Sequence, residues 1–182
     1  MNQARQRLPG DPTVAASVSR MLRVDHAGEY GAARIYAGQL AVLRRSDTAP
    51  VLREMQAQEQ MHLERFSELI ARRRVRPTAL LPLWHLAGFA LGAATAALGQ
   101  RAAMACTVAV EEAIDAHYAD QIADLDDSES DLRGTLVKFR DDELQHRDTA
   151  LQHGAEQAPG YRLLAAAIKA GCKVAIHISE RI

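Results

Sequence analysis

Two short segments of this chain, EQMHLERF beginning at Glu59 and ELQHRD beginning at Glu143, contain the pattern Glu-x-x-His. Residues three apart lie on one face of an α-helix, so Glu59 with His62, and Glu143 with His146, can direct a carboxylate and an imidazole at one ion. This combination of oxygen and nitrogen ligands suits iron and related divalent metals. The chemistry that these residues predict is therefore metal binding.

A single Glu-x-x-His is a weak signal, because 11 Glu and 7 His in 182 residues produce about 0.4 such spacings by chance. Here two copies occur, in halves of the chain that resemble each other. EYGAARIYAGQ from Glu29 aligns with EEAIDAHYADQ from Glu111, and each segment is followed by a turn and then by a Glu-x-x-His. The chain therefore resembles two helix hairpins, each with one Glu on its first helix and one Glu-x-x-His on its second.

Four helices can bring these groups to one depth in the core of a bundle. One Glu from each of two helices, with Glu-x-x-His from each of the other two, is the pattern of ferritin-like di-iron or di-manganese carboxylate proteins. Without metal, four carboxylates in an apolar core would repel one another and be costly to ionise. The competing interpretation places the same residues on a solvated face. We predict a two-metal site formed by Glu29, Glu59, His62, Glu111, Glu143 and His146.

Two neighbouring acidic residues are rival ligands. Adjacent residues of a helix point about 100° apart, so only one of Glu111 and Glu112 can face the core, and the repeat selects Glu111. Glu112 is then expected to face solvent or to support a ligand. Asp25 lies one turn before the first predicted ligand, but its counterpart in the repeat is Thr107, which disfavours it.

Other polar residues near the predicted site are candidates for supporting roles. Asp142 could hydrogen-bond to His62 across the bundle and hold one imidazole tautomer, although a surface position is an equal alternative. His117 and Tyr118 lie about two turns beyond Glu111, where they could line a substrate channel, while core packing is the ordinary alternative for Tyr118.

The elements that must position these residues are helices. Helix-forming residues with helical periodicity dominate, only 4% of residues are aromatic, and alternating β-branched runs are absent from the sequence. The pattern predicts long helices over about 13–44, 50–74, 100–124, 131–153 and 161–180. We expect an all-α, ferritin-like four-helix bundle with extra connecting and C-terminal helices, formed by residues 1–182 as a single domain, with residues 1–12 flexible.

The segment 77–100 has no formal charge. Its length could span a bilayer, but prolines, glycines and many alanines interrupt it, so spanning is weakly supported. Two interpretations stay balanced on composition: a short helix in the membrane interface, with the basic run ARRRVRP near the headgroups, or a buried connecting helix. The GFALG sequence within it matches the G-x-x-x-G pattern of close helix packing, which is a weak signal in so short a run.

Charge and cysteine content exclude several classes of protein. The net charge of -1 provides no global basic field to attract nucleic acid. Cys106 and Cys172 lie far apart without a CxxC motif, which argues against a disulfide framework or a cysteine zinc site, and we expect both to be small core residues.

Several longer segments carry a resemblance to a known family. RVDHAGEYGAARIYAGQLAVL, EQMHLERF, MACTVAVEEAIDAHYADQI, KFRDDELQHRD and AGCKVAIHISERI resemble the demethoxyubiquinone hydroxylase family of ubiquinone biosynthesis, from about residue 19 to the C-terminus. The family's metal-ligand pattern falls on the six residues predicted from the repeat. The chain departs from the family in the short acidic link after ADQI and at His177, where an aromatic residue is common.

The resemblance implies an activity and its cofactors. It implies a flavin-independent monooxygenase that hydroxylates the ring of a polyprenylated demethoxy-benzoquinol, with O₂ at a centre of two iron ions and NADH as reductant. The chain has no G-x-G-x-x-G sequence, so any NADH site is not of the Rossmann type. The alternative function is a ferritin-like, non-catalytic iron-binding or ferroxidase protein.

The resemblance also implies a location and partners. It implies a peripheral protein on the cytoplasmic face of a bacterial cell membrane, or on the matrix face of the mitochondrial inner membrane if the chain is eukaryotic. This favours the interfacial interpretation of segment 77–100, because a polyprenyl tail must be drawn from lipid. A lipid-binding accessory protein of ubiquinone biosynthesis and further copies of the chain are candidate partners.

Overall fold

The computed structural model describes residues 11–182 and contains six α-helices and two short 3-10 helices over that range. The helices are α1 (Val14–Leu43), α2 (Ala49–Arg72), α3 (Leu81–Ala97), α4 (Gln100–Asp124), η1 (Asp127–Glu129), α5 (Ser130–Gln152), η2 (Ala155–Gln157) and α6 (Tyr161–Ser179). These bounds lie within about two residues of those predicted for the five long helices. The expected flexibility of residues 1–12 falls mainly on residues 1–10, which lie outside the described part.

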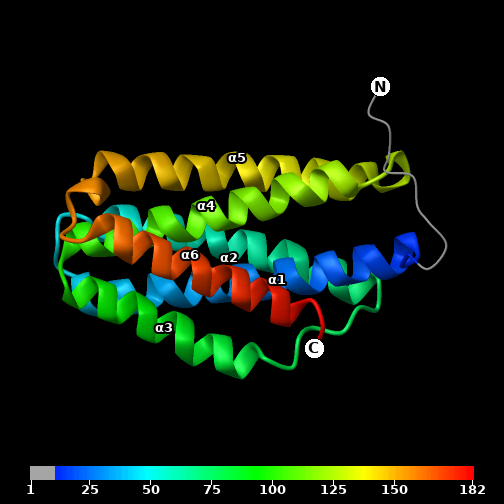
Figure 1. Cartoon of the computed structure of the whole chain (residues 1–182), viewed down its shortest axis with the longest axis horizontal. Helices are drawn as coiled ribbons and strands as arrows, with labels where there is room; N and C mark the ends of the chain where they lie inside the picture. Colours follow the sequence, from blue (N-terminus) through cyan, green and yellow to red (C-terminus); the bar gives the residue numbers. More distant parts are fainter. Residues whose placement is uncertain (1–10) are drawn as a thin grey trace.

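The four longest helices form two hairpins. α1 packs against α2, and α4 packs against α5, while α3 lies along α1 and α6 lies along α4 (Figure 1). Each second helix returns antiparallel to its predecessor, which places Glu29 near the depth of Glu59 and Glu111 near the depth of Glu143. The expected fold class, an all-α ferritin-like bundle with extra connecting and C-terminal helices, is confirmed, and no strand occurs among residues 11–182.

Helix boundaries follow local chemistry. The Thr13 side chain accepts a hydrogen bond from the Ala16 amide at 3.2 Å and caps the start of α1. α2 begins with Pro50 in its first turn, where the missing N–H has no intrahelical partner to lose. Gly99, at φ 114°, joins α3 to α4 in a backbone conformation that other residues rarely adopt.

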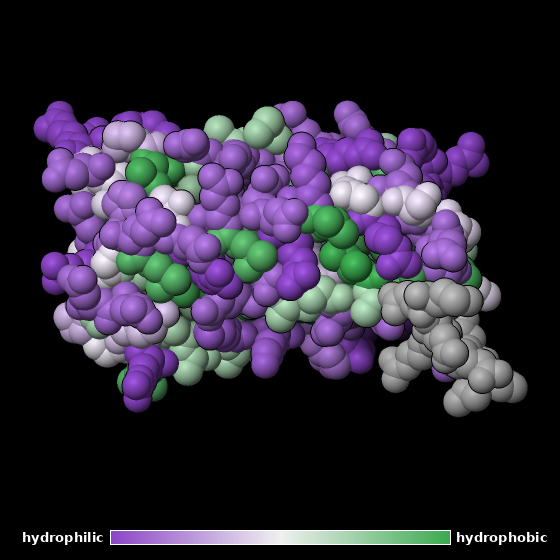
Figure 2. All heavy atoms as spheres, turned by 90° about the horizontal axis from the view of Figure 1, so that it is seen from above, coloured by the Kyte–Doolittle hydropathy of each residue, from purple (hydrophilic) through white to green (hydrophobic). Residues whose placement is uncertain are grey.

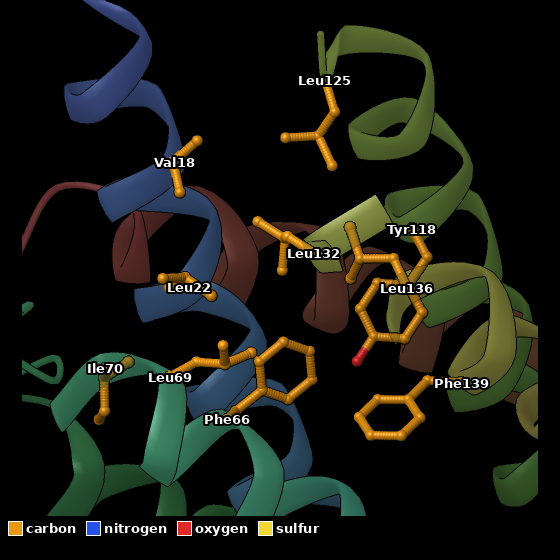
Figure 3. Close-up of a cluster of buried hydrophobic side chains, with 10 residues drawn as sticks. All are labelled: Val18, Leu22, Phe66, Leu69, Ile70, Tyr118, Leu125, Leu132, Leu136 and Phe139. Carbon is orange, nitrogen blue, oxygen red and sulfur yellow. The ribbon is translucent and has the colours of Figure 1, made fainter. Parts of the chain in front are cut away.

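An apolar cluster fills one end of the bundle. It draws residues from α1, α2, α4 and α5 and from the turn after α4, so it clamps the two hairpins together (Figure 3). Its aromatic members pack ring against ring, with 5.5 Å between the centroids of Phe66 and Phe139 and 6.3 Å between those of Phe66 and Tyr118. The cluster consists of Val18, Leu22, Phe66, Leu69, Ile70, Tyr118, Leu125, Leu132, Leu136 and Phe139.

Glycines let α3 approach α1 closely. A Cβ atom on Gly92 would overlap the Ile35 carbonyl, and one on Gly38 would overlap the Phe89 carbonyl. A Cβ on Gly88 would lie 2.8 Å from the Gly31 carbonyl oxygen. Both glycines of the GFALG sequence therefore sit at a backbone-to-backbone contact, as the G-x-x-x-G pattern predicted.

The remaining faces of α3 are apolar and exposed. Its buried residues are Gly88, Gly92, Thr95 and Ala96, whereas Leu86 is 69% exposed and Leu98, at its end, is 73% exposed. The helix is thus partly buried, because one face packs on α1 and the opposite face is exposed to solvent. Over residues 11–182, no helix combines the length and apolar character needed to cross a bilayer.

The basic run at the end of α2 has defined partners. Arg72 contacts Asp131 at 3.1 Å and Arg73 contacts Glu129 at 2.7 Å, so the arginines meet acidic residues of η1 and of the first turn of α5. These ion pairs join the two hairpins at their ends. The face of the molecule seen from above is mostly hydrophilic, with separate apolar patches (Figure 2).

Candidate metal centre

All six predicted ligands converge in the middle of the bundle. Each has at most 2% of its surface exposed. Ligand atoms of Glu29, Glu59, His62 and Glu143 lie within 4.8 Å of one another, and so do those of Glu59, Glu111, Glu143 and His146. Glu59 and Glu143 belong to both groups. The geometry therefore describes two adjacent candidate metal positions. Each has one histidine and one glutamate of its own, and the other two glutamates are placed to contribute to both positions.

The imidazole Nδ1 atoms point into the cluster. His62 Nδ1 lies 3.1 Å from Glu143 Oε1 and 3.4 Å from Glu29 Oε2. In the other half, His146 Nδ1 lies 3.1 Å from Glu59 Oε1 and 3.4 Å from Glu143 Oε2. Nδ1 is consequently the atom that each imidazole offers to an ion.

The opposite ring nitrogens are held by side chains from the other hairpin. His62 Nε2 lies 3.1 Å from Asp142 Oδ2, so the predicted hydrogen bond across the bundle is present. His146 Nε2 lies 2.5 Å from Gln58 Oε1, a contact that sequence reasoning missed. The repeat could have predicted this contact, because Gln58 directly precedes Glu59 just as Asp142 directly precedes Glu143. Both acceptors favour the tautomer with the proton on Nε2, which leaves Nδ1 free for a metal.

Two tyrosines bond to the two glutamates that are not shared. The Tyr36 hydroxyl donates to Glu111 Oε1 at 2.5 Å, and the Tyr118 hydroxyl donates to Glu29. Both tyrosines are 1% exposed. These positions are equivalent in the repeat, and each tyrosine reaches the carboxylate of the opposite hairpin. The pseudo-symmetry read from the sequence is therefore present in the side-chain contacts.

Without a bound cation, it is unfavourable for all four buried carboxyl groups of the cluster to be ionised. Burial, and then the charge of Glu143, raise the pKa of Glu59 and Glu111 well above the ordinary value. Burial alone would lower the pKa of His62, but the adjacent carboxylates of Glu143 and Glu29 raise it to about 10. Protons on the Glu59 and Glu111 carboxyls and on the His62 imidazole are thus favoured in the absence of metal, and divalent cations would replace them. Glu143 is the exception, because the neighbouring His146 and His62 lower its pKa to about 2 despite burial.

The donor set fits two divalent metal ions. Both oxygens of Glu59 and Glu143, one oxygen each of Glu29 and Glu111, and both histidine Nδ1 atoms are buried without a hydrogen-bond partner. Buried polar atoms normally have partners, so this concentration of unsatisfied donors and acceptors needs an explanation. When ionised, the four carboxylates carry a charge equal and opposite to that of two M²⁺ ions. Mixed oxygen and nitrogen ligands suit iron.

The rival acidic residues lie outside this centre. Asp25 is 2% exposed and accepts a hydrogen bond from Gln121 Nε2 at 2.7 Å, but it belongs to neither ligand group. Glu112 is half-buried and pairs with Lys169 on α6. The structure thus brings into the cluster the member of each pair that the repeat selected.

The two predicted channel residues lie at different depths. Tyr118 is a buried member of the apolar cluster (Figure 3). Its hydroxyl donates to Glu29. The His117 side chain is 17% exposed, with its Nε2 atom 2.7 Å from Gln121 Nε2 and 3.5 Å from Asp25 Oδ1. His117 therefore lies near the surface of α4, whereas Tyr118 lies in the core with its hydroxyl on Glu29.

Fold and centre together define a class of protein. A four-helix bundle with a buried set of four glutamates and two histidines is the arrangement of ferritin-like proteins, and this set could hold two metal ions. The family model described as "Ubiquinone biosynthesis protein COQ7" matches residues 16–179. The chain therefore belongs to the COQ7 family.

Named relatives define the family's chemistry. The chain is 61% identical over 180 residues to the Rhodospirillum rubrum protein named 3-demethoxyubiquinol 3-hydroxylase, covering 98% of this chain and 85% of the relative. It is 57% identical over 171 residues to the human protein named NADPH-dependent 3-demethoxyubiquinone 3-hydroxylase, mitochondrial, covering 92% and 79%. The yeast protein named 5-demethoxyubiquinone hydroxylase, mitochondrial, is 43% identical over 185 residues, covering 92% and 79%. The expected family is thus confirmed, and the chain is an enzyme of the hydroxylase type.

Proposed function

We propose that this protein hydroxylates the ring of a polyprenylated demethoxy-benzoquinol with O₂ at a carboxylate-bridged di-iron centre. The observation that carries the proposal is the cluster of six buried ligands with Glu59 and Glu143 shared between its halves. The names of the relatives support the substrate class. One oxygen atom of O₂ enters the ring C–H bond as a hydroxyl group, and the other leaves as water after taking up two electrons and two protons.

A reduced nicotinamide nucleotide is the proposed source of the electrons. The resemblance implied NADH, whereas the names of the human and bovine relatives specify NADPH. Both nucleotides carry the same hydride-donating ring, so the proposal concerns their shared chemistry. Comparing turnover with NADH and with NADPH at equal concentrations decides which this chain uses.

Bound iron would supply the binding and activation of O₂, and the side chains have separate tasks. Asp142 and Gln58 hold the two imidazoles with Nδ1 directed inward. Tyr36 and Tyr118 orient the unshared carboxylates by hydrogen bonding. The apolar cluster that contains Tyr118 excludes water from that end of the centre (Figure 3).

We also propose that the substrate enters beside His117 and Tyr118 from a membrane surface. The exposed apolar faces of α3 and α6 support this, with Leu86 at 69% and Leu163 at 78% exposure. These faces would insert between lipid headgroups and give the polyprenyl tail a path from the bilayer. The surface is then the cytoplasmic face of a bacterial membrane or the matrix face of the mitochondrial inner membrane. The proposed partners are a lipid-binding accessory protein and further copies of this chain.

The test is hydroxylation by purified, iron-loaded protein of a demethoxy-quinol with a shortened prenyl tail, under ¹⁸O₂. We expect one ¹⁸O atom in the product ring, and loss of both product and bound iron in Glu59→Ala and Glu143→Ala. A matched pair of adjacent residues provides the control. Glu111→Gln should lower both quantities, while Glu112→Gln should retain them, because Glu112 pairs with Lys169 outside the centre. Full hydroxylation by metal-free protein would rule out the proposal, and iron oxidation without ring hydroxylation would favour the ferroxidase alternative.

A further inference from the structure

A second polar site lies on the outside of the bundle, in a hollow between α1, α2 and α3. Its volume is about 420 Å³, within the usual range for small-molecule sites. None of the described residues that line it is acidic, whereas two arginines, a histidine and a tyrosine are present. The lining residues are Tyr30, Ala33, Arg34, Arg53, Gln56, Ala57, Gln60, Leu63 and His85.

The two arginines have no carboxylate partner. Within residues 11–182, neither Arg34 nor Arg53 forms an ion pair, although many other arginines of this chain do. Arg34 Nε is buried and makes no hydrogen bond. Arg53 uses one nitrogen, Nη2, to donate to the Arg44 carbonyl at 3.0 Å, which leaves its other donors free. Two positive charges with unused donors therefore face one hollow.

Neighbouring groups hold these donors in place. The Arg34 guanidinium carbon lies 5.2 Å from the centre of the Phe89 ring on α3, a cation–π contact that restrains the side chain. Tyr30 Oη lies 2.7 Å from His85 Nδ1. Whichever ring nitrogen of His85 carries the proton, this pair keeps one N–H or O–H donor for a ligand.

We propose that this hollow binds the phosphate group of a small molecule. Guanidinium groups form paired hydrogen bonds with phosphate oxygens, and the absence of acidic lining removes electrostatic competition. Two sources share this chemistry: the phosphates of a nicotinamide nucleotide, and the headgroup of a phospholipid. The exposed apolar face of α3 beside Phe89 would accommodate acyl chains in the second case. The nucleotide source rests on the proposed use of a reduced nicotinamide nucleotide, whereas phosphate binding by this hollow does not depend on the hydroxylation reaction.

Calorimetric titration of the full, iron-loaded chain with inorganic pyrophosphate tests the shared chemistry. Replacing one arginine should remove a charge-assisted contact, so Arg34→Gln and Arg53→Gln should each raise the Kd about tenfold. Arg147→Gln is the matched control, because it removes an equal charge from α5, outside the hollow, and should leave the Kd within about twofold. Arg53 is exposed, so its variant keeps the test available if Arg34→Gln does not fold.

Two further arms distinguish the sources. If the ligand is a nucleotide, NADPH or NADH binds more tightly than pyrophosphate, and Arg34→Gln removes that advantage. If it is a lipid headgroup, Arg34→Gln reduces flotation with phosphatidylglycerol vesicles more than Arg147→Gln does, while nucleotides bind no more tightly than pyrophosphate. Either result supports the site. The proposal is overturned if pyrophosphate, nucleotides and anionic vesicles all fail to bind, or if all bind Arg34→Gln and Arg147→Gln equally.

Discussion

Tyr118 on α4 donates its hydroxyl to Glu29 on α1, so a residue of the second hairpin orients a predicted metal ligand of the first. Tyr36 and Glu111 repeat this contact in the opposite direction, at 2.5 Å. Each of these hydrogen bonds therefore makes the orientation of a glutamate side chain in one hairpin depend on how the other hairpin packs. The centre is a property of the assembled bundle and not of either half alone.

Removing either of these hydroxyl groups should weaken iron binding. Tyr118→Phe and Tyr36→Phe keep the ring but leave a ligand carboxylate without its donor, and loss of such outer contacts typically costs about tenfold to a hundredfold in affinity. Competition with a chelator of known iron affinity measures the change. Tyr30→Phe is the control, because its hydroxyl bonds to His85 outside the centre. Equal affinity in all three variants would contradict an orienting role.

The carboxylate of Asp142 should contribute more to iron affinity than that of the adjacent Asp141. Asp142→Ala removes the acceptor from His62 Nε2, so the imidazole loses the contact that holds Nδ1 inward. We expect the iron affinity to fall by about tenfold or more, with helical content unchanged. Asp141→Ala removes an exposed carboxylate one residue away and should leave iron binding unaltered. Chelator competition and circular dichroism measure the two quantities, and equal behaviour of the variants would refute the assignment.

Asp25 should prove dispensable for iron binding despite its burial. Asp25→Asn keeps an oxygen acceptor for Gln121 and removes a charge that lies outside both ligand groups. We expect this variant to retain the wild-type iron content per chain, measured by elemental analysis. Glu29→Gln, one turn away on the same helix, should reduce that content. A loss of iron in Asp25→Asn as large as in Glu29→Gln would make Asp25 a ligand.

The contact between α3 and α1 predicts opposite effects for two glycine substitutions. Gly92→Ala places a methyl group against the Ile35 carbonyl and should lower the free energy of unfolding by about 1–3 kcal/mol. Gly134→Ala lies in α5 with nothing within 4 Å of the added carbon, so it should raise that free energy by about 0.5–1 kcal/mol. Urea denaturation at fixed iron loading measures both. Stabilisation by both substitutions would mean that α3 does not pack as described.

The two thiols should react slowly in the native protein. Burial raises the pKa of Cys106 to about 12 and that of Cys172 to about 11, so at pH 8 almost none of either group is the reactive thiolate. Iodoacetamide should label the folded chain slowly at pH 8 and much faster in denaturant, where both values return to the ordinary range. Mass spectrometry locates the label. The expectation that both cysteines are core residues holds for Cys106, which is buried, whereas Cys172 is half-buried at the edge of the core. Rapid native labelling of Cys106 would contradict its place in the core.

The sequence by itself determined the helices and the set of residues at the centre. Helix formation and the i, i+3 relation of Glu59 with His62 are local, so they are readable from spacing. The internal repeat then identified Glu29 and Glu111 as the remaining carboxylates, because two copies of one hairpin must present equivalent faces. It also contained the pairing of Gln58 with the second histidine, since Gln58 occupies the position of Asp142.

Tertiary structure decided what depends on how helices face one another. Spacing alone does not reveal that Glu59 and Glu143 are shared between two positions, because this follows from the depth at which the hairpins meet. The side of α3 that packs was equally hidden, since an apolar helix has no polar face to mark its exposed side. The hollow beside Arg34 exists only because glycines bring α3 against α1, which places residues far apart in the chain around one volume.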